Sequence, residues 1–429
     1  MRTLDVYLGE DLIGHIVENR KGGRFEYSAD VVARLAGRPV LSLSFPVKAR
    51  PFGEGKTSNW FNGLLPEGNR RDEVCRSLGV SEYDWIGLLA EIGWECAGAV
   101  RVFDRDGAQR RMSEYKQIST AELAERLSTI SQQTPQPDSS LFRMSLGGFQ
   151  EKLCVAMSTL PQSAESVEEV AHVRAEEILL PVGDAPSTHI LKPENSSAYR
   201  GVAESEAWAM TAASYAANAA RVALLDIKNA PVTLVVERFD RELVNGHKFA
   251  KRLHQEDACQ ALGLDPHNKY ASTGKPKGDD PTYASIAALL RKFSVEPEHE
   301  LSELLRQVLV NLALGNWDAH AKNIALLYRE PMVPVLAPLY DVVPIAEVEP
   351  RTEFLSMRIN GHIRPEHVSA VDVIAEAASW GVPTDEAQSI LNDVLSRLKD
   401  GVYFASKVYP QAGKRHKKAV LGRIAQLSE

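Results

Sequence analysis

The sequence predicts an α+β protein with two lobes, the first rich in strands and the second mainly helical. Short runs with the alternation or apolar character of strands recur up to about residue 239, whereas helical patterns dominate from residue 256 onward. One strand pair, residues 324–328 and 333–339, interrupts the helical part, with a turn at residues 329–331. A chain of 429 residues also exceeds one ordinary core, so we expect roughly two or three packed units.

The first of these units, residues 1–110, predicts a small β/α subdomain. The run from Ser81 to Asp84 resembles a capping box, so we expect a helix to begin there. Strands are expected at residues 4–8, 12–17 and 96–103, and helices at residues 59–65, 70–78 and 85–92.

The second unit, residues 111–240, predicts a β-rich lobe, and the third, residues 241–429, the helical lobe. Residues 131–140 are polar and contain two prolines, which is typical of a linker. Strands are expected at residues 151–157, 188–192 and 232–239, with an alanine-rich helix at about 204–220 between the last two.

Composition excludes several classes of protein. No apolar run reaches the roughly 18–20 residues that a membrane-spanning helix needs. Acidic residues at Asp5, Glu10 and Asp11 argue against a secretory leader. The four cysteines offer no Cys-x-x-Cys spacing, so we expect reduced thiols in a cytoplasmic protein. A net charge of −8 argues against non-specific nucleic-acid binding by the whole chain.

The strongest chemical signal lies in residues 316–323 and in the Asp341 that follows the strand pair. Phosphoryl transfer requires an oriented hydroxyl, bound phosphates and a metal ion that absorbs negative charge. Asp318 has the position of a carboxylate that accepts the hydroxyl proton, and Asn323 and Asp341 offer the hard oxygen ligands that Mg²⁺ prefers. Taken alone, the spacing is also compatible with a helix N-cap at Asp318 and a turn at Asn323.

A lysine at the end of a predicted strand could bind phosphates. Lys192 ends the run from Thr188, and the helix that follows carries Glu204 and Glu206, either of which could reach back to the lysine. The alternative for a lone lysine in this position is a solvated strand end.

Two further segments fit a nucleotide site. Residues 145–152 place two glycines directly before a strand, where bare backbone could approach phosphates. This run matches neither the Gly-x-Gly-x-x-Gly nor the Walker pattern, and alone it predicts only a hairpin turn. Residues 235–241 form a strand that ends between the two lobes, where Glu237 and Phe239 could contact an adenine. The alternative is an ordinary strand exit with a surface ion pair.

Taken together and in this order, these segments resemble the HipA family of kinase toxins. The resemblance spans about residues 3–400 and implies a bilobed protein-kinase-like fold with an extra N-terminal β/α subdomain. The matching runs are residues 61–68, 145–152, 186–192, 237–241, 252–257, 315–323 and 339–341.

The resemblance implies a role for each matching residue. Asp318 would be the catalytic base, Asn323 and Asp341 would hold Mg²⁺, and Ser145 would be an autophosphorylation site whose modification silences the kinase. The implied nucleotide-binding residues are Gly147, Gly148, Phe149, Gln150, Glu151, Lys152, Lys192, Glu237, Arg238, Phe239, His320, Lys322, Asn323, Tyr340 and Asp341.

The resemblance also implies a function and partners. It implies an ATP- and Mg²⁺-dependent serine/threonine protein kinase that acts as a toxin on a translation component such as an aminoacyl-tRNA synthetase. A small helix-turn-helix antitoxin would neutralise it, and operator DNA would be bound only through that complex; no membrane partner is expected.

The sequence departs from the family pattern in three places. These are an acidic insertion at residues 162–184, Trp317 directly before the base, and the loop at residues 274–277. The latter two bear on the choice of protein substrate. A small-molecule kinase and a catalytically idle, ATP-binding co-repressor scaffold stand as alternatives.

Overall fold

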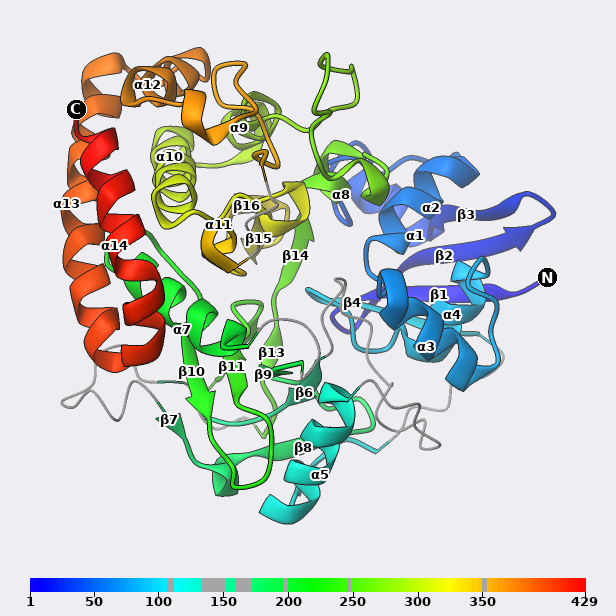
Figure 1. The fold of residues 1–429 in the computed structure, drawn as a ribbon. Coiled ribbons are helices and arrows are strands. Elements are labelled where there is room, and N and C mark those ends of the chain that lie inside the picture. Colours follow the sequence, from blue (N-terminus) through cyan, green and yellow to red (C-terminus); the bar gives the residue numbers. More distant parts are fainter. Residues whose placement is uncertain are drawn as a thin grey trace.

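The computed structural model describes residues 1–105, 112–132, 152–158, 160, 172–195, 200–244, 248–348 and 353–429. Within these ranges the chain is α+β, as the sequence predicts. Figure 1 shows the N-terminal subdomain in blue on one side of the molecule and the two long C-terminal helices on the other. Among the described helices, none is long and apolar enough to cross a membrane.

The N-terminal subdomain is a four-stranded antiparallel sheet covered by helices. Fully buried aromatic side chains fill the space between them, among them Phe25, Phe45 and Trp60. The strands, in the order β3-β2-β1-β4, are β1 (Thr3–Leu8), β2 (Asp11–Asn19), β3 (Gly22–Tyr27) and β4 (Val100–Asp104). The helices are α1 (Ala29–Leu35), α2 (Glu54–Asn62), α3 (Gly68–Leu78) and α4 (Trp85–Ile92).

Helix α4 has the predicted bounds, but three other features of this subdomain differ from the prediction: the span of α2, which was expected at residues 59–65, the N-cap of α4 and the start of β4. Asp84, not Ser81, is the N-cap of α4, because the Asp84 carboxylate accepts a hydrogen bond from the Gly87 amide at 2.8 Å. Strand β4 begins at Val100 rather than Cys96, because the residues between α4 and β4 form a turn that contacts the rest of the molecule.

The second unit contains a five-stranded sheet in the order β6-β9-β11-β10-β7, in which only β10 and β7 pair in parallel. Its strands are β6 (Leu153–Val155), β7 (His172–Val173), β9 (His189–Pro193), β10 (Val222–Leu225) and β11 (Thr233–Glu237). Beside it lie the pair β5 (Glu114–Gln117) and β8 (Leu179–Val182) and the helices α5 (Thr120–Ser131) and α7 (Val202–Ala213). Helix α5 occupies the start of the predicted linker, and residues 133–140 of that linker lie outside the described residues.

Helix α7 joins the two lobes. It ends at Ala213, earlier than the predicted residue 220. The helix does not continue to Ala220 because the Ala220 amide donates a hydrogen bond to the carbonyl of Leu339 at 2.8 Å. Its buried face packs against the long helices of the third unit. Gly401 allows this close approach, because a Cβ there would clash with the carbonyl oxygen of Ala212.

The third unit is mainly helical and contains the predicted strand pair. Strands β15 (Ala325–Glu330) and β16 (Val333–Leu336) confirm that prediction, and β14 (His254–Asp257) adds a third strand. The short pair β12 (Arg241–Glu242) and β13 (Lys251–Arg252) precedes this sheet. The helices are α8 (Ala258–Leu262), α9 (Tyr283–Phe293), α10 (Pro297–Leu314), α11 (Ile345–Val348), α12 (Ala370–Ser379), α13 (Thr384–Val408) and α14 (Pro410–Leu427).

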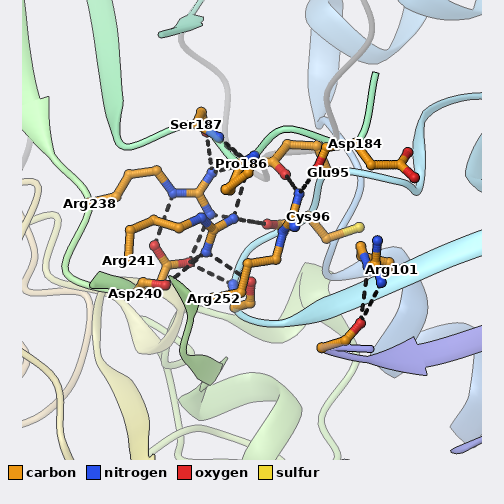
Figure 2. A network of polar contacts seen from close by, with 12 residues as sticks. Glu95, Cys96, Arg101, Asp184, Pro186, Ser187, Arg238, Asp240, Arg241 and Arg252 are labelled. Carbon is orange, nitrogen blue, oxygen red and sulfur yellow. Dashed lines mark hydrogen bonds and ion pairs between the residues drawn. The ribbon is translucent and has the colours of Figure 1, made fainter. Parts of the chain in front are cut away.

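A buried ionic cluster joins the turn before β4 to the end of β11 (Figure 2). We call it the Glu95 cluster, and its members are Glu95, Ser187, Arg238, Asp240, Arg241 and Arg252. One end of the cluster is tied to the backbone of the subdomain, because an Asp240 oxygen accepts a hydrogen bond from the Gly98 amide at 2.6 Å.

Glu95 is the centre of this cluster and is fully shielded from solvent. One of its oxygens lies 3.2 Å from Arg238 and 3.1 Å from Arg241, and the other lies 2.6 Å from Arg252. Burial alone would raise the pKa of Glu95, but the guanidinium groups of Arg241, Arg252 and Arg238 outweigh it and hold the pKa well below its usual range. The carboxylate is therefore charged and neutralises arginines from two lobes.

Replacing Glu95 by Gln should destabilise the fold strongly, because the buried arginines would lose a shared counter-charge. We expect the free energy of unfolding to fall by about 3–5 kcal/mol, measured by urea denaturation. The control is Asp30→Asn, which breaks an exposed pair with Arg34 on α1 and should cause almost no change. Equal losses in the two variants would contradict a central role for the cluster.

Candidate active site

Lys192 lies at the contact between the two lobes, near the end of β9. Its ammonium is 2.7 Å from an oxygen of Glu206 on α7 and 2.6 Å from an oxygen of Asp341, beyond β16. The lysine side chain is 8% exposed, so a solvated strand end is excluded. The sequence left two partners open on the helix. Glu206 is the one that contacts Lys192, whereas Glu204 pairs with Arg415 of α14.

Opposite charges stabilise Lys192 and Asp341 in this triad, whereas burial and the negative charge of Asp341 raise the pKa of Glu206. Burial would lower the pKa of Lys192, but the carboxylates of Asp341 and Glu206 outweigh it and raise the pKa above its usual value. Burial likewise opposes ionisation of Asp341, yet the Lys192 ammonium holds the pKa of Asp341 well below its usual range. Asp341 also has a φ of +59°, in the left-handed region. Such backbone is costly for a non-glycine residue and concentrates at functional sites.

The loop that carries Asp318 is held by its own hydrogen bonds. The Asn323 side-chain amide donates to the Asp318 carbonyl at 3.2 Å, and the His320 amide donates to the same carbonyl at 2.8 Å. Asp318 is not a helix N-cap, because the short turn η4 (Ala321–Asn323) follows His320. The Asp318 carboxylate instead accepts a hydrogen bond from the Tyr270 hydroxyl at 3.0 Å.

The segment around Asp341 lies against this loop. The Tyr340 hydroxyl donates to the Lys322 carbonyl at 2.6 Å, and the Asn316 side chain donates to the Asp341 carbonyl at 3.4 Å. The ring of Phe239, at the end of β11, packs on the Tyr340 ring with centroids 5.4 Å apart. The structure therefore brings the predicted catalytic loop, Asp341 and the residues that follow β11 into one region.

Glu237 and Phe239, which were expected to contact adenine, and Arg238 between them have three different environments. The Glu237 amide donates to the Arg221 carbonyl and the Arg238 amide to the Thr188 carbonyl, each at 2.9 Å. The Arg238 guanidinium belongs to the Glu95 cluster. Phe239 is the one of the three whose side chain packs beside the catalytic loop.

The predicted glycine segment is described only at its last residue. Ser145 and residues 147–151 lie outside the described residues. Lys152 is described, and its charge acts on both Lys192 and Asp341. Burial and the positive charge of Lys192 lower the pKa of Lys152 to about 8. The charges of Lys152, directly before β6, and of Lys192, on β9, thus both act on Asp341.

His320 and Lys322, which were also expected to bind nucleotide, contact residues to which the sequence analysis gave no role. His320 packs edge-on against Tyr270 with ring centroids 5.0 Å apart, and burial with the nearby Lys269 lowers its pKa to about 4, so it is neutral at pH 7. The Lys322 ammonium contacts Glu67 of the N-terminal subdomain at 2.5 Å. The sequence assigned no role to Glu67 or Tyr270, although Glu67 lies in the conspicuous run of residues 61–68.

The donor set of the site suits a hard cation. Within the described residues, no group of three or more His, Cys, Asp or Glu could hold a metal ion. Asn323 and Asp341 supply an amide and a carboxylate oxygen. Such a sparse oxygen set fits Mg²⁺, which keeps several of its waters and binds phosphates as well.

Comparison with known families settles the relationship of the chain. One family model, the HipA-like C-terminal domain, matches residues 144–402, and a second, the HipA N-terminal domain, matches residues 4–103. The chain belongs to the HipA family. A putative kinase of Sinorhizobium fredii, Y4mE, is 32% identical over 394 residues, which cover 89% of this chain and 87% of the relative.

The chain is also similar to a protein named as a HipA toxin and to a HipA protein of solved structure. The serine/threonine-protein kinase toxin HipA of Shewanella oneidensis is 27% identical over 417 residues, covering 93% of this chain and 88% of that protein. A structure from Shewanella oneidensis MR-1, solved as HipA with HipB and operator DNA, superposes with a TM-score of 0.80 at 25% identity, covering 98% and 96% of the two chains. The chain is therefore a HipA-family kinase with the HipA protein-kinase-like fold, as the sequence predicts.

The lowered pKa of Lys152 predicts a pH-dependent affinity for nucleotide. Above about pH 8 Lys152 loses its proton and with it an attraction for phosphate, so affinity for ATP should fall several-fold between about pH 7 and pH 9. Calorimetric titration of the protein with ATP at these pH values measures this affinity. Lys152→Met should bind more weakly at pH 7 and lose the dependence; an unchanged dependence would assign the titration to another group.

Proposed function

We propose that this chain is an ATP- and Mg²⁺-dependent serine/threonine protein kinase that acts as a toxin. In this proposal residues 1–110 are the N-terminal subdomain, residues 111–240 the nucleotide-binding lobe and residues 241–429 the catalytic lobe. The single observation that carries it is the ammonium of Lys192 between Glu206 and Asp341. Protein kinases require this arrangement, a strand lysine paired with a helix glutamate next to a metal-binding aspartate.

Each residue of the site has a distinct task in phosphoryl transfer. Lys192 binds the α- and β-phosphates, and Asp318 accepts the proton of the attacking serine hydroxyl. Asn323 and Asp341 would hold Mg²⁺, and the bound ion would neutralise negative charge on the phosphates. Tyr270 donates a hydrogen bond to Asp318 at 3.0 Å and thereby orients the carboxylate that would accept the proton.

The glycine segment supports a second part of the proposal, self-inactivation. Residues 147–152 would cover the phosphates of ATP, with Ser145 at the start of this cover. A phosphate on Ser145 carries about −1.5 to −2 charges at neutral pH. The phosphates of ATP would repel it, so the segment could no longer close over the nucleotide.

The partners we propose follow from the family. The HipA structure from Shewanella oneidensis contains HipB and operator DNA, and we propose a HipB-like helix-turn-helix antitoxin for this chain. A net charge of −8 favours DNA contact through that antitoxin rather than by the kinase alone. The proposed target is an aminoacyl-tRNA synthetase. Trp317 directly precedes the base, so the choice among such targets is expected to differ from that of other HipA kinases.

Comparing Asp318→Asn with the wild type in cells tests the proposal. Phosphoproteomics should find new phosphoserine on a translation enzyme, and on Ser145 of the kinase itself, only with the wild type. The variant keeps the size of the side chain but cannot accept a proton, so we expect a loss on the order of a hundredfold or more. Equal phosphorylation by both proteins would remove Asp318 from the role of base. No phosphorylation by either would favour an idle scaffold.

A further inference from the structure

A glutamate of the N-terminal subdomain contacts the catalytic loop. Glu67 lies directly before α3, at the end of the run that begins with Phe61. Its two oxygens contact two lysines of the catalytic lobe, one 2.5 Å from the Lys322 ammonium and the other 2.9 Å from the Lys269 ammonium. Lys322 also donates to the Gly63 carbonyl at 3.1 Å. Two of the three donors of Lys322 are therefore directed to the subdomain.

The three charged groups are shielded from water. The side chain of Glu67 is 18% exposed, and those of Lys322 and Lys269 are 7% and 6% exposed. Burial opposes the charge of Glu67, but Lys322 and Lys269 outweigh it and lower its pKa to about 2. One carboxylate thus bridges two ammonium groups and weakens the repulsion between them. The negative charge of Asp257 also acts on Lys322.

Both lysines border the residues that hold Asp318. Lys322 lies inside the catalytic loop, four residues after Asp318. Lys269 accepts a hydrogen bond at its carbonyl from the Ala321 amide at 3.1 Å, and its neighbour Tyr270 donates to the Asp318 carboxylate at 3.0 Å. A displacement of either lysine would therefore shift the backbone or the hydrogen-bond donor that orients Asp318.

We propose that Glu67 is a positioning residue for phosphoryl transfer, through which the N-terminal subdomain fixes the catalytic loop. This inference rests on the proposed function. Glu67 acts through Lys322 and Lys269 and has no contact with Lys192 or Asp341, which we assign to nucleotide and metal. The resemblance implied that Lys322 binds nucleotide, but its ammonium contacts Glu67 and the Gly63 carbonyl, so here we assign it to the position of the loop. Its loss should therefore slow the chemical step and leave nucleotide binding intact.

The test compares Glu67→Gln with the wild type as purified full chains. The substitution keeps the shape of the side chain and removes its charge, leaving Lys269 and Lys322 without their shared carboxylate. We expect kcat to fall on the order of tenfold to a hundredfold, as misplacement of a catalytic group does, while KM for ATP stays within about twofold. A kcat within about twofold of the wild type, or a rise in KM that accounts for the loss, would overturn the inference.

A matched control lies in the same interface. Ser44→Ala removes a hydrogen bond of 2.8 Å to the Gln260 carbonyl. This bond also joins the subdomain to the catalytic lobe, but it involves none of residues 318–323. We expect no change in kcat for this variant. An equal fall in kcat in both variants would mean that Glu67 only helps to attach the subdomain to the catalytic lobe.

Hydrogen exchange provides a readout that does not require activity. In Glu67→Gln the amides of residues 318–323 should exchange faster than in the wild type, and in Ser44→Ala they should not. Unchanged exchange in Glu67→Gln would contradict the inference even if the wild type proved inactive, a result that would separately defeat the proposed function. If Glu67→Gln does not fold, the double variant with Lys269→Met removes one of the two buried lysine charges, and the same faster exchange is expected.

Discussion

The ammonium of Lys192 is the interaction on which the site depends. It brings a strand of the β-rich lobe, helix α7 and the segment after β16 to one point through Glu206 and Asp341. A buried lysine is tolerated only with such partners, because a buried charge without a counter-charge is far more costly than the pair. The loop that carries Asp318 and the residues that follow β11, among them Phe239, lie around this buried ion pair.

Three carboxylates bind the N-terminal subdomain to different parts of the kinase. Glu95 contacts the arginines that follow β11. Glu256 of β14 is buried and accepts hydrogen bonds from the Leu43 amide at 3.0 Å and from the Trp60 indole at 3.3 Å. Glu67 contacts the catalytic loop. These contacts fix how the subdomain lies against the β-rich lobe and the catalytic loop, and under the proposed function the Glu67 contact helps to position that loop.

Local patterns were enough to predict the α+β class, the strand pair β15–β16 and the strand that carries Lys192. The spacing of apolar residues and the residues typical of turns can both be read from the sequence. Contacts between distant segments were not predictable in this way. The choice of Glu206 over Glu204 depends on how α7 rotates against the sheet, and the end of α7 depends on pairing with Leu339. The Glu67 contact with Lys322 joins residues 255 positions apart, which no local pattern encodes.

The central claim, that this site binds Mg²⁺ and ATP for phosphoryl transfer, is tested most directly by a crystal structure of the protein with Mg²⁺ and a non-hydrolysable ATP analogue. We predict Lys192 on the α- and β-phosphates, Asn323 and Asp341 on the metal ion, and the γ-phosphate facing Asp318. A nucleotide bound elsewhere, or one whose γ-phosphate is remote from Asp318, would contradict the account.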